Sequence, residues 1–207
     1  MKVTKEKATE NRAALVRAAS RLFRERGIDG VGVAEITKNA GLTHGALYAQ
    51  FPSKEALAAE AFASGLRPGL EKITAGRPGG PASLSDFLDD YLSSGHRDNL
   101  AAGCPMSASA SEIARRDKIV CERFTEGFEQ LVALIEGNLG AAAVNADKHQ
   151  RALAMMAAMI GGVAACALDR KFHISGCCLT GDGYDLLADA QAVEVISPCL
   201  HHFLSSS

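Results

Sequence analysis

Apolar residues recur at intervals of three and four along most of the chain, with polar residues between them. This period is that of an amphipathic α-helix, and no segment sustains the alternation that is typical of a half-buried strand. The pattern predicts helices over residues 5–27, 33–40, 44–51, 53–70, 83–92, 106–115, 117–139, 147–168 and 184–203. The sequence therefore predicts an all-α protein with about nine helices and no internal repeat.

The stretch 33–51 predicts two short helices joined by a tight turn, which is the outline of a helix-turn-helix. Gly41 can adopt the left-handed backbone conformation that ends a helix. Thr43 is a good N-cap for the next helix, because its hydroxyl can accept a hydrogen bond from a free backbone amide. Pro52 steers Phe51 out of the helical region, so the second helix should end there. The residues expected to form the three-helix core are Ile36, Ala40, Leu42, Leu47 and Phe51.

The sequence VAEI at 33–36, followed by AGLTHGALYAQFPSKEAL at 40–57, resembles the DNA-binding domain of the TetR family of bacterial transcriptional regulators. The match covers roughly the first quarter of the chain. The resemblance implies an N-terminal helix-turn-helix domain over residues 1–53 and a C-terminal domain over 54–207 that binds an effector and dimerises. Gly32 and Ala34 depart from the family's pattern, so one phosphate contact there is expected to be missing or made by a backbone amide.

Six residues around the second short helix are the candidate DNA contacts. They are Thr43, His44, Gly45, Tyr48, Gln50 and Lys54. Thr43 lies at a helix N-terminus, where free amides attract phosphate. We expect His44, Gly45 and Gln50 to face the major groove, since glycine permits close backbone approach and glutamine can pair with adenine. Tyr48 and Lys54 are phosphate candidates, as the resemblance implies for the matching Tyr and Lys positions.

Charge is distributed unevenly along the chain. Residues 1–60 hold ten Lys or Arg and seven Asp or Glu, a net charge near +3, whereas the remainder is near −5. A basic segment attracts phosphate. Arg12 or Arg17 on the first helix is therefore expected either to contact the DNA backbone or to lie on a solvated face.

Aromatic and methionine side chains on the middle helices are the candidate lining of an effector pocket. Such residues at helical spacing usually form an ordinary core, and the pocket is what the resemblance implies. Because these faces carry few charges, we expect a weakly polar or aromatic small molecule that shifts the protein between DNA-competent and incompetent states. The candidates are Phe87, Tyr91, Met106, Phe124, Phe128, Met155 and Met159. The expected function is a ligand-responsive repressor of a palindromic operator.

The last two predicted helices, 147–168 and 184–203, have apolar faces wider than one core needs. The resemblance implies that they pair with their mates in a four-helix bundle, which predicts a homodimer. Small residues at Gly161, Gly162 and Ala164 would let helices approach closely, although they could also pack within one protomer. A dimer fits the two half-sites, about 34 Å apart, that helix-turn-helix proteins usually span.

The six cysteines are expected to be thiols, because the N-terminus has no apolar core of a signal peptide and no membrane span is evident. A cytoplasmic protein follows from the same pattern. Cys104, at a predicted helix N-terminus, could be a reactive thiol, making the protein a sensor of oxidants or electrophiles. The alternative is a buried, inert thiol. His173, Cys177 and Cys178 match no common zinc spacing, so no metal and no other cofactor is predicted.

Two other classes of function remain as alternatives. A thiol-dependent enzyme needs a nucleophile, a base and a group that orients the base, and no motif places them together. The chain is therefore predicted not to be an enzyme. A DNA-packaging protein without a ligand would cover DNA uniformly, whereas a regulator would protect one palindrome in a footprint.

Overall fold

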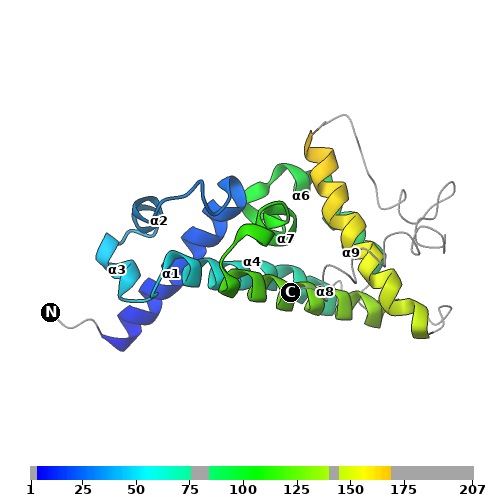
Figure 1. Ribbon diagram of the computed structural model, residues 1–207, viewed down its shortest axis with the longest axis horizontal. Coiled ribbons are helices and arrows are strands. Elements are labelled where there is room, and N and C mark those ends of the chain that lie inside the picture. The colour runs from blue at the N-terminus through cyan, green and yellow to red at the C-terminus, as the bar shows by residue number, and fades with distance from the viewer. Residues whose placement is uncertain (1–3, 76–83, 140–144, 169–207) are drawn as a thin grey trace. The chain divides into compact units, whose positions relative to one another are not determined.

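The computed structural model describes residues 4–75, 84–139 and 145–168. These ranges contain helices and no strand, which confirms the predicted all-α class. The α-helices are α1 Lys5–Arg26, α2 Val33–Asn39, α3 His44–Tyr48, α4 Lys54–Ala75, α5 Leu84–Tyr91, α6 Ser94–Asp98, α7 Pro105–Ser109, α8 Lys118–Asn138 and α9 Asn145–Leu168 (Figure 1). Two 3₁₀ turns, η1 Leu100–Ala102 and η2 Ile113–Arg115, complete the order. The predicted helix at 184–203 and the loop with His173 lie outside the described residues.

The chain divides into two compact units. Unit 1 comprises residues 1–69 and 99–128, and unit 2 comprises residues 70–98 and 129–207. Helices α4 and α8 therefore contribute residues to both units. The predicted functional boundary after residue 53 falls within unit 1 and stays a prediction.

The core of unit 1 is formed by apolar residues of α1 to α4 together with residues from η2 and α8. Ile36, Leu47 and Phe51 are at most 2% exposed, and Ala40 and Leu42 pack against the same cluster, which confirms the predicted three-helix core. Burial of each large side chain stabilises the fold by roughly 1.5–3 kcal/mol. The same cluster includes the predicted apolar stripe of α1, namely Leu15, Ala19, Leu22 and Phe23.

Capping residues set the ends of the long helices as predicted. Gly27 ends α1 with φ 72°, and its amide donates to the carbonyl of Phe23. Ser53 precedes α4, and its hydroxyl accepts a 3.1 Å hydrogen bond from the amide of Ala56. Asp117 caps α8 by accepting from the amide of Ile119 at 3.1 Å.

Two predicted helix ends were wrong. Helix α3 ends at Tyr48 rather than at Phe51, because the amide of Gln50 bonds back three residues to Leu47 and tightens the chain into a turn. Helix α4 continues through Pro68 to Ala75 instead of ending near residue 70. Pro68 cannot donate its backbone hydrogen bond, but Ile73, which is 3% exposed, stabilises the turns that follow by burial.

The predicted helix at 106–115 is also shorter than expected. Helix α7 ends at Ser109, and the chain continues as a turn and then as η2. The segment between them has no buried residue, and the next buried side chain is that of Ile113, the first residue of η2. Ile119 was predicted on the apolar face of α8 but is 44% exposed, because the buried face is set by Val120, one position further along.

Unit 2 is built from α5, α6, α9 and the ends of α4 and α8. Helix α6 lies against α9, shown in yellow in Figure 1. The buried apolar side chains of unit 2 include Ile73, Leu88, Tyr91, Leu131, Ile135, Met155, Met156 and Met159. Methionine thus contributes three of the largest fully buried side chains of α9.

Candidate nucleic-acid interface

The corner between α2 and α3 is a Schellman motif centred on Gly41. The amide of Leu42 donates to the carbonyl of Thr37 at 2.8 Å, and the amide of Gly41 donates to the carbonyl of Lys38 at 3.1 Å. These are the two reverse bonds that define the motif. Gly41 has φ 69°, and a Cβ there would meet nothing within 4 Å. Glycine is therefore required for its backbone conformation and not for lack of space.

Helix α3 lies against α1 and α2 (Figure 1), and one of its side chains is buried. Leu47 is fully buried, whereas Thr43, His44 and Gly45 are exposed, and Tyr48 is 52% exposed. The rings of His44 and Tyr48 are 5.4 Å apart between centroids, as expected for residues four apart on one helix face. The helix therefore presents a continuous polar and aromatic surface to solvent.

Thr43 begins α3 but does not cap it with its side chain. Its backbone has the extended conformation of an N-cap, with φ −84° and ψ 160°, but the hydroxyl accepts no capping hydrogen bond. The carbonyl of Thr43 accepts from the amide of Ala46 at 3.0 Å instead. The predicted side-chain cap was wrong, and Thr43 starts the helix through its backbone. Gly32 starts α2 in the same way, also without a side-chain cap.

Arg12 of α1 holds the chain that follows α3. Its guanidinium donates to the carbonyl of Gln50 at 2.7 Å and pairs with both carboxylate oxygens of Glu60 on α4. The same group lies 4.1 Å from the ring centroid of Phe51, a cation–π contact. Of the two arginines considered for phosphate contact, Arg12 is thus bound within the protein, whereas Arg17 is exposed.

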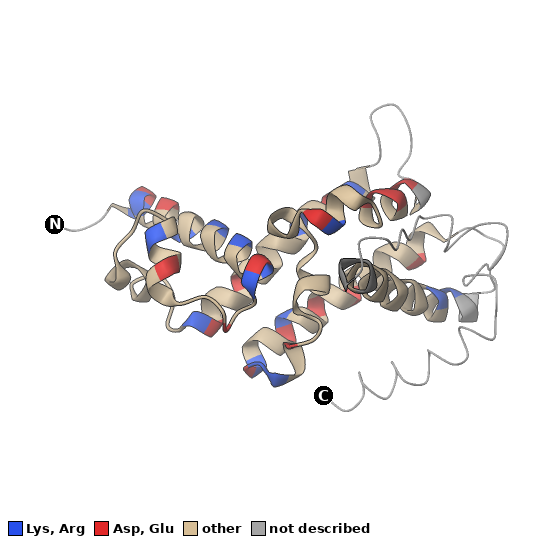
Figure 2. Ribbon diagram, turned by 90° about the horizontal axis from the view of Figure 1, so that it is seen from above, with Lys and Arg blue, Asp and Glu red and all other residues tan. Residues whose placement is uncertain are grey.

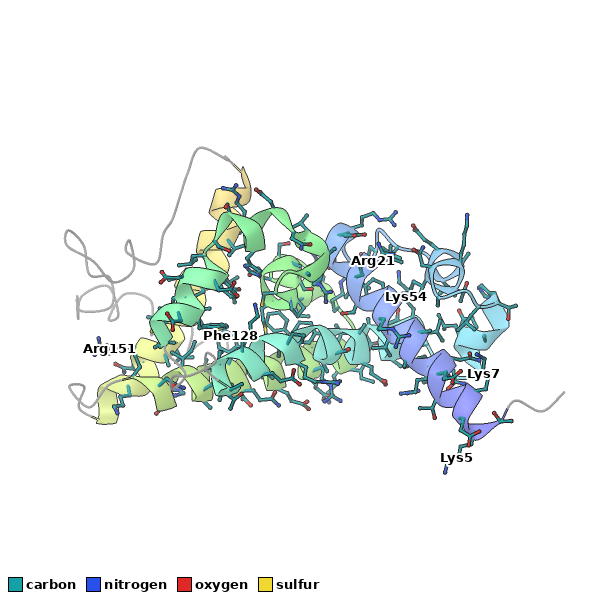
Figure 3. All side chains as sticks on the ribbon, turned by 180° about the vertical axis from the view of Figure 1, so that it is seen from behind. Lys5, Lys7, Arg21, Lys54, Phe128 and Arg151 are labelled. Carbon is teal, nitrogen blue, oxygen red and sulfur yellow. The ribbon has the colours of Figure 1, made fainter. Side chains whose placement is uncertain are left out.

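The two remaining candidates lie just beyond α3. Gln50 is half-buried, and its backbone carbonyl is the acceptor for Arg12. Lys54 is the first residue of α4 and is also half-buried. Figure 3 shows Lys54 on unit 1 together with Lys5 and Lys7 on the first turns of α1. These residues belong to the lysines and arginines, shown in blue in Figure 2, that are spaced along α1 and the helices next to it.

Arg17 and Arg21 line a shallow groove between α1 and α2. Arg21 donates to the side-chain oxygen of Asn39 at 2.8 Å and pairs with Glu25 at 3.4 Å. The groove therefore carries positive charge that is partly neutralised within the protein.

Family models match most of the chain. The model described as bacterial regulatory proteins, tetR family, matches residues 15–61. A second model, the tetracyclin repressor-like C-terminal domain, matches residues 80–175. The chain belongs to the TetR family. It is therefore a member of a family of regulators and not of an enzyme family.

Curated relatives agree with this membership. The chain is 25% identical over 177 residues to the HTH-type transcriptional regulator LmrA of Bacillus subtilis, covering 81% of this chain and 94% of LmrA. It is 44% identical over 54 residues to TtgR of Pseudomonas putida, covering 26% of each protein. It is 31% identical over 99 residues to YfiR of Bacillus subtilis, covering 47% of this chain and 48% of YfiR, so the match spans about half of that relative.

Solved structures show the same fold. A TetR transcriptional regulator from Legionella pneumophila has a TM-score of 0.66 at 15% identity, covering 80% of this chain and 88% of that chain. FadR from Bacillus subtilis in complex with stearoyl-CoA has a TM-score of 0.60 at 16% identity, covering 86% and 97%. At these identities the likeness concerns the fold alone.

The effector-pocket candidates of this TetR-family chain are divided between the two units. Met106, Phe124 and Phe128 belong to unit 1, and the other four candidates belong to unit 2. Five of the seven are buried, namely Tyr91, Met106, Phe128, Met155 and Met159. Phe87 is half-buried, and its ring centroid is 5.8 Å from that of Tyr91. Their role in effector binding stays a prediction.

Cys104 is the residue before α7 and is half-buried. It interacts electrostatically with Arg24. Burial lowers the pKa of Arg24, and the nearby Cys104 and Glu25 offset part of that shift.

Within the described ranges, no three His, Cys, Asp or Glu side chains gather as metal ligands. Cys177 and Cys178 lie outside those ranges. Among the helices described, none is long and apolar enough to cross a membrane.

Proposed function

We propose that this TetR-family protein binds a palindromic operator as a homodimer, represses transcription there, and is released by a small apolar or aromatic effector. The observation that supports this most directly is α3. A single buried residue, Leu47, and the Gly41 corner hold this helix, while His44 and Tyr48 are turned to solvent. A short, rigidly held helix with exposed polar and aromatic side chains suits the major groove.

The six candidates have separate roles in this proposal. His44, Gly45 and Gln50 face base edges and supply sequence preference. Thr43, Tyr48 and Lys54 contact phosphates and set the register of the protein on the duplex. Lys54 is suited to this role because it is the first residue of α4, where backbone amides add to its charge.

The dimer interface proposed here uses α9 and the predicted helix at 184–203. Gly161 and Ala164 of α9 are exposed, and Gly162 is half-buried. Small residues on an exposed helix face allow a partner helix to approach closely. Pairing of two copies would then place two α3 helices on half-sites about 34 Å apart.

Unit 2 supports the proposed effector site. Met155, Met156 and Met159 are almost fully buried on one helix, and methionine adapts its shape more readily than branched residues do. FadR, a structural neighbour, holds stearoyl-CoA in its crystal structure. A screen should therefore include fatty acyl thioesters beside aromatic compounds. An effector that couples to DNA binding should change operator affinity by about 5- to 150-fold.

The test begins with selection of duplexes from a random library by the wild-type protein, followed by footprinting. We expect one palindromic sequence to be enriched and protected. Lys54→Ala should reduce the slope of log affinity against log salt by about one unit without changing the preferred sequence. His44→Ala should relax the preference at one position, at a cost of about 1–3 kcal/mol. Lys72→Ala, which removes a surface lysine of unit 2 paired with Asp90, serves as the control.

Two outcomes would contradict the proposal. A monomeric protein that enriches no sequence would exclude an operator-binding dimer. Uniform protection of DNA would instead favour a packaging protein. If operator binding is confirmed but no compound in the screen alters it, the effector part of the proposal fails alone.

A further inference from the structure

The two ends of α1 are bound to different parts of unit 1. In its N-terminal half, Arg12 donates to the carbonyl of Gln50, just beyond α3. Near its C-terminal end, the helix and the loop after it are bound to the segment 99–116. Helix α1 thus lies as a rigid connection, 22 residues long, between the DNA-facing part of unit 1 and that segment.

Arg24 makes the first attachment at the C-terminal end. Its Nε donates to the carbonyl of Ala101 at 2.9 Å, and a second guanidinium nitrogen donates to the same oxygen. Another nitrogen donates to the hydroxyl of Ser20 at 2.6 Å. The half-buried guanidinium therefore ties α1 to η1 through a backbone group.

Asp29, Glu112 and Arg116 make the second attachment, which we call the charged clasp. Arg116 donates to both carboxylate oxygens of Asp29 at 2.5 and 2.6 Å and to Glu112 at 2.8 Å. The other oxygen of Glu112 accepts from the amide of Ile28 at 3.2 Å. The clasp thus binds both the side chain and the backbone of the loop that follows α1.

The clasp is not an ordinary surface ion pair. The side chains of Arg116 and Glu112 are only 13% and 17% exposed, whereas Asp29 is 81% exposed. The hydrogen bonds that Arg116 donates to Asp29 raise the pKa of Arg116 and lower the pKa of Asp29. A mostly buried guanidinium is costly without its carboxylates, so loss of either partner should loosen the loop.

We propose that Arg116 is a positioning residue for operator recognition. Through the charged clasp it fixes the C-terminal end of α1, and α1 in turn fixes α3 through Arg12. This inference rests on the proposed function, since it concerns how accurately α3 meets its operator. Neither Arg116 nor Asp29 needs to touch DNA for this effect.

Asp29→Asn gives the decisive test, because two explanations predict opposite signs. Removing a negative charge from a basic DNA-binding unit strengthens phosphate attraction, so electrostatics alone predicts tighter binding. Positioning predicts weaker binding, because the neutral amide cannot replace the bidentate carboxylate. Arg116→Lys gives a second test. It keeps the charge, so electrostatics alone predicts unchanged binding, but it loses the planar fork, so positioning predicts weaker binding.

The experiment measures binding to the duplex that the wild-type protein enriches from a random library, by fluorescence anisotropy at several salt concentrations. Asp29→Asn and Arg116→Lys should each weaken binding by about fivefold or more, with the wild-type salt slope retained. Glu126→Gln is the matched control. It also removes one carboxylate from unit 1, but that carboxylate pairs with Arg123 within α8, and its affinity should be unchanged or slightly higher.

A second measurement separates positioning from loss of the fold. Hydrogen exchange in the free protein should become faster at the amides of α3 in Asp29→Asn, while the amides of the unit 1 core keep their protection. Tighter or unchanged binding by Asp29→Asn, or unchanged exchange in α3, would overturn the role of Arg116 alone. If the wild-type protein enriches no duplex, the proposed function is overturned and this role with it.

Discussion

Each unit has an apolar core, but the interactions that accompany it differ between unit 1 and unit 2. In unit 1, arginines on one element bind partners far away in the sequence, as Arg12 does with Glu60 and Arg116 with Asp29. In unit 2, Met155, Met156 and Met159 fill the interior, and the ion pair between Lys72 and Asp90 lies at the surface. Directional bonds hold a fixed geometry, whereas methionine packing tolerates rearrangement. A fixed geometry suits base reading, and a deformable interior suits ligand binding.

The largest expected effect that tests this comparison concerns Phe51. Phe51→Ala should reduce the free energy of unfolding by about 3–5 kcal/mol, because it opens a cavity and removes the face on which Arg12 lies. Met156→Ala in unit 2 should cost less, about 2–3 kcal/mol, because the neighbouring methionines can rearrange into the space it leaves. Urea unfolding followed by circular dichroism measures both. Equal losses would contradict the proposed difference between the units.

Two glycines of α8 provide the next comparison. A Cβ on Gly127 in unit 1 would lie 2.6 Å from Leu66 and 3.1 Å from Met106, whereas a Cβ on Gly137 in unit 2 would meet nothing within 4 Å. Gly127→Ala should therefore destabilise the protein by about 1–3 kcal/mol through overpacking. Gly137→Ala should stabilise it by up to about 1 kcal/mol through helix propensity. Thermal unfolding should show a lower midpoint for Gly127→Ala and a higher one for Gly137→Ala, and a higher midpoint for both would show that α8 is not tightly packed at Gly127.

The smallest expected effect is a difference in the pH at which each unit weakens. Burial lowers the pKa of His96, whose Nδ1–H donates a 2.6 Å hydrogen bond to the carbonyl of Tyr91. His96 binds its proton more readily in the unfolded chain than in the folded one. Its contribution to the free energy of unfolding is therefore fully present above about pH 6.5 and is lost as pH falls through the folded pKa. The lowered pKa of Asp29 places the matching loss in unit 1 below about pH 4.

Hydrogen exchange followed from pH 7 to pH 5 measures this difference. The amides of unit 2 should lose protection first, and His96→Gln should remove that dependence. A simultaneous loss in both units would show that His96 does not set the response of unit 2.

Local signals made the helix-turn-helix predictable. Gly41 and Ser53 each act within a few residues of their own position, and the apolar period identified α1, α8 and α9 from the sequence alone. The cap by Thr43 was wrong, since a hydroxyl at an N-cap position can accept a bond from an amide without doing so in the folded chain. The stretch after Met106 has too few apolar residues at helical spacing, so the sequence did not show where α7 ends.

The charged contacts of unit 1 could not be predicted. Arg12 is 48 positions from Glu60, and Arg116 is 87 positions from Asp29. Each arginine looks like part of a solvated helix face in a single sequence, because nothing local marks a distant carboxylate as its partner. The interactions proposed here to position α3 therefore became visible only in the folded chain.

The open space around Gly41 has a stereochemical consequence. An L-configured Cβ would have open space around it, but an L-amino acid with positive φ is strained by roughly 1–2 kcal/mol. Alanine of the mirror-image configuration, installed by chemical synthesis, would keep the corner without that strain. The bend ahead of α3 therefore selects for handedness and not for size.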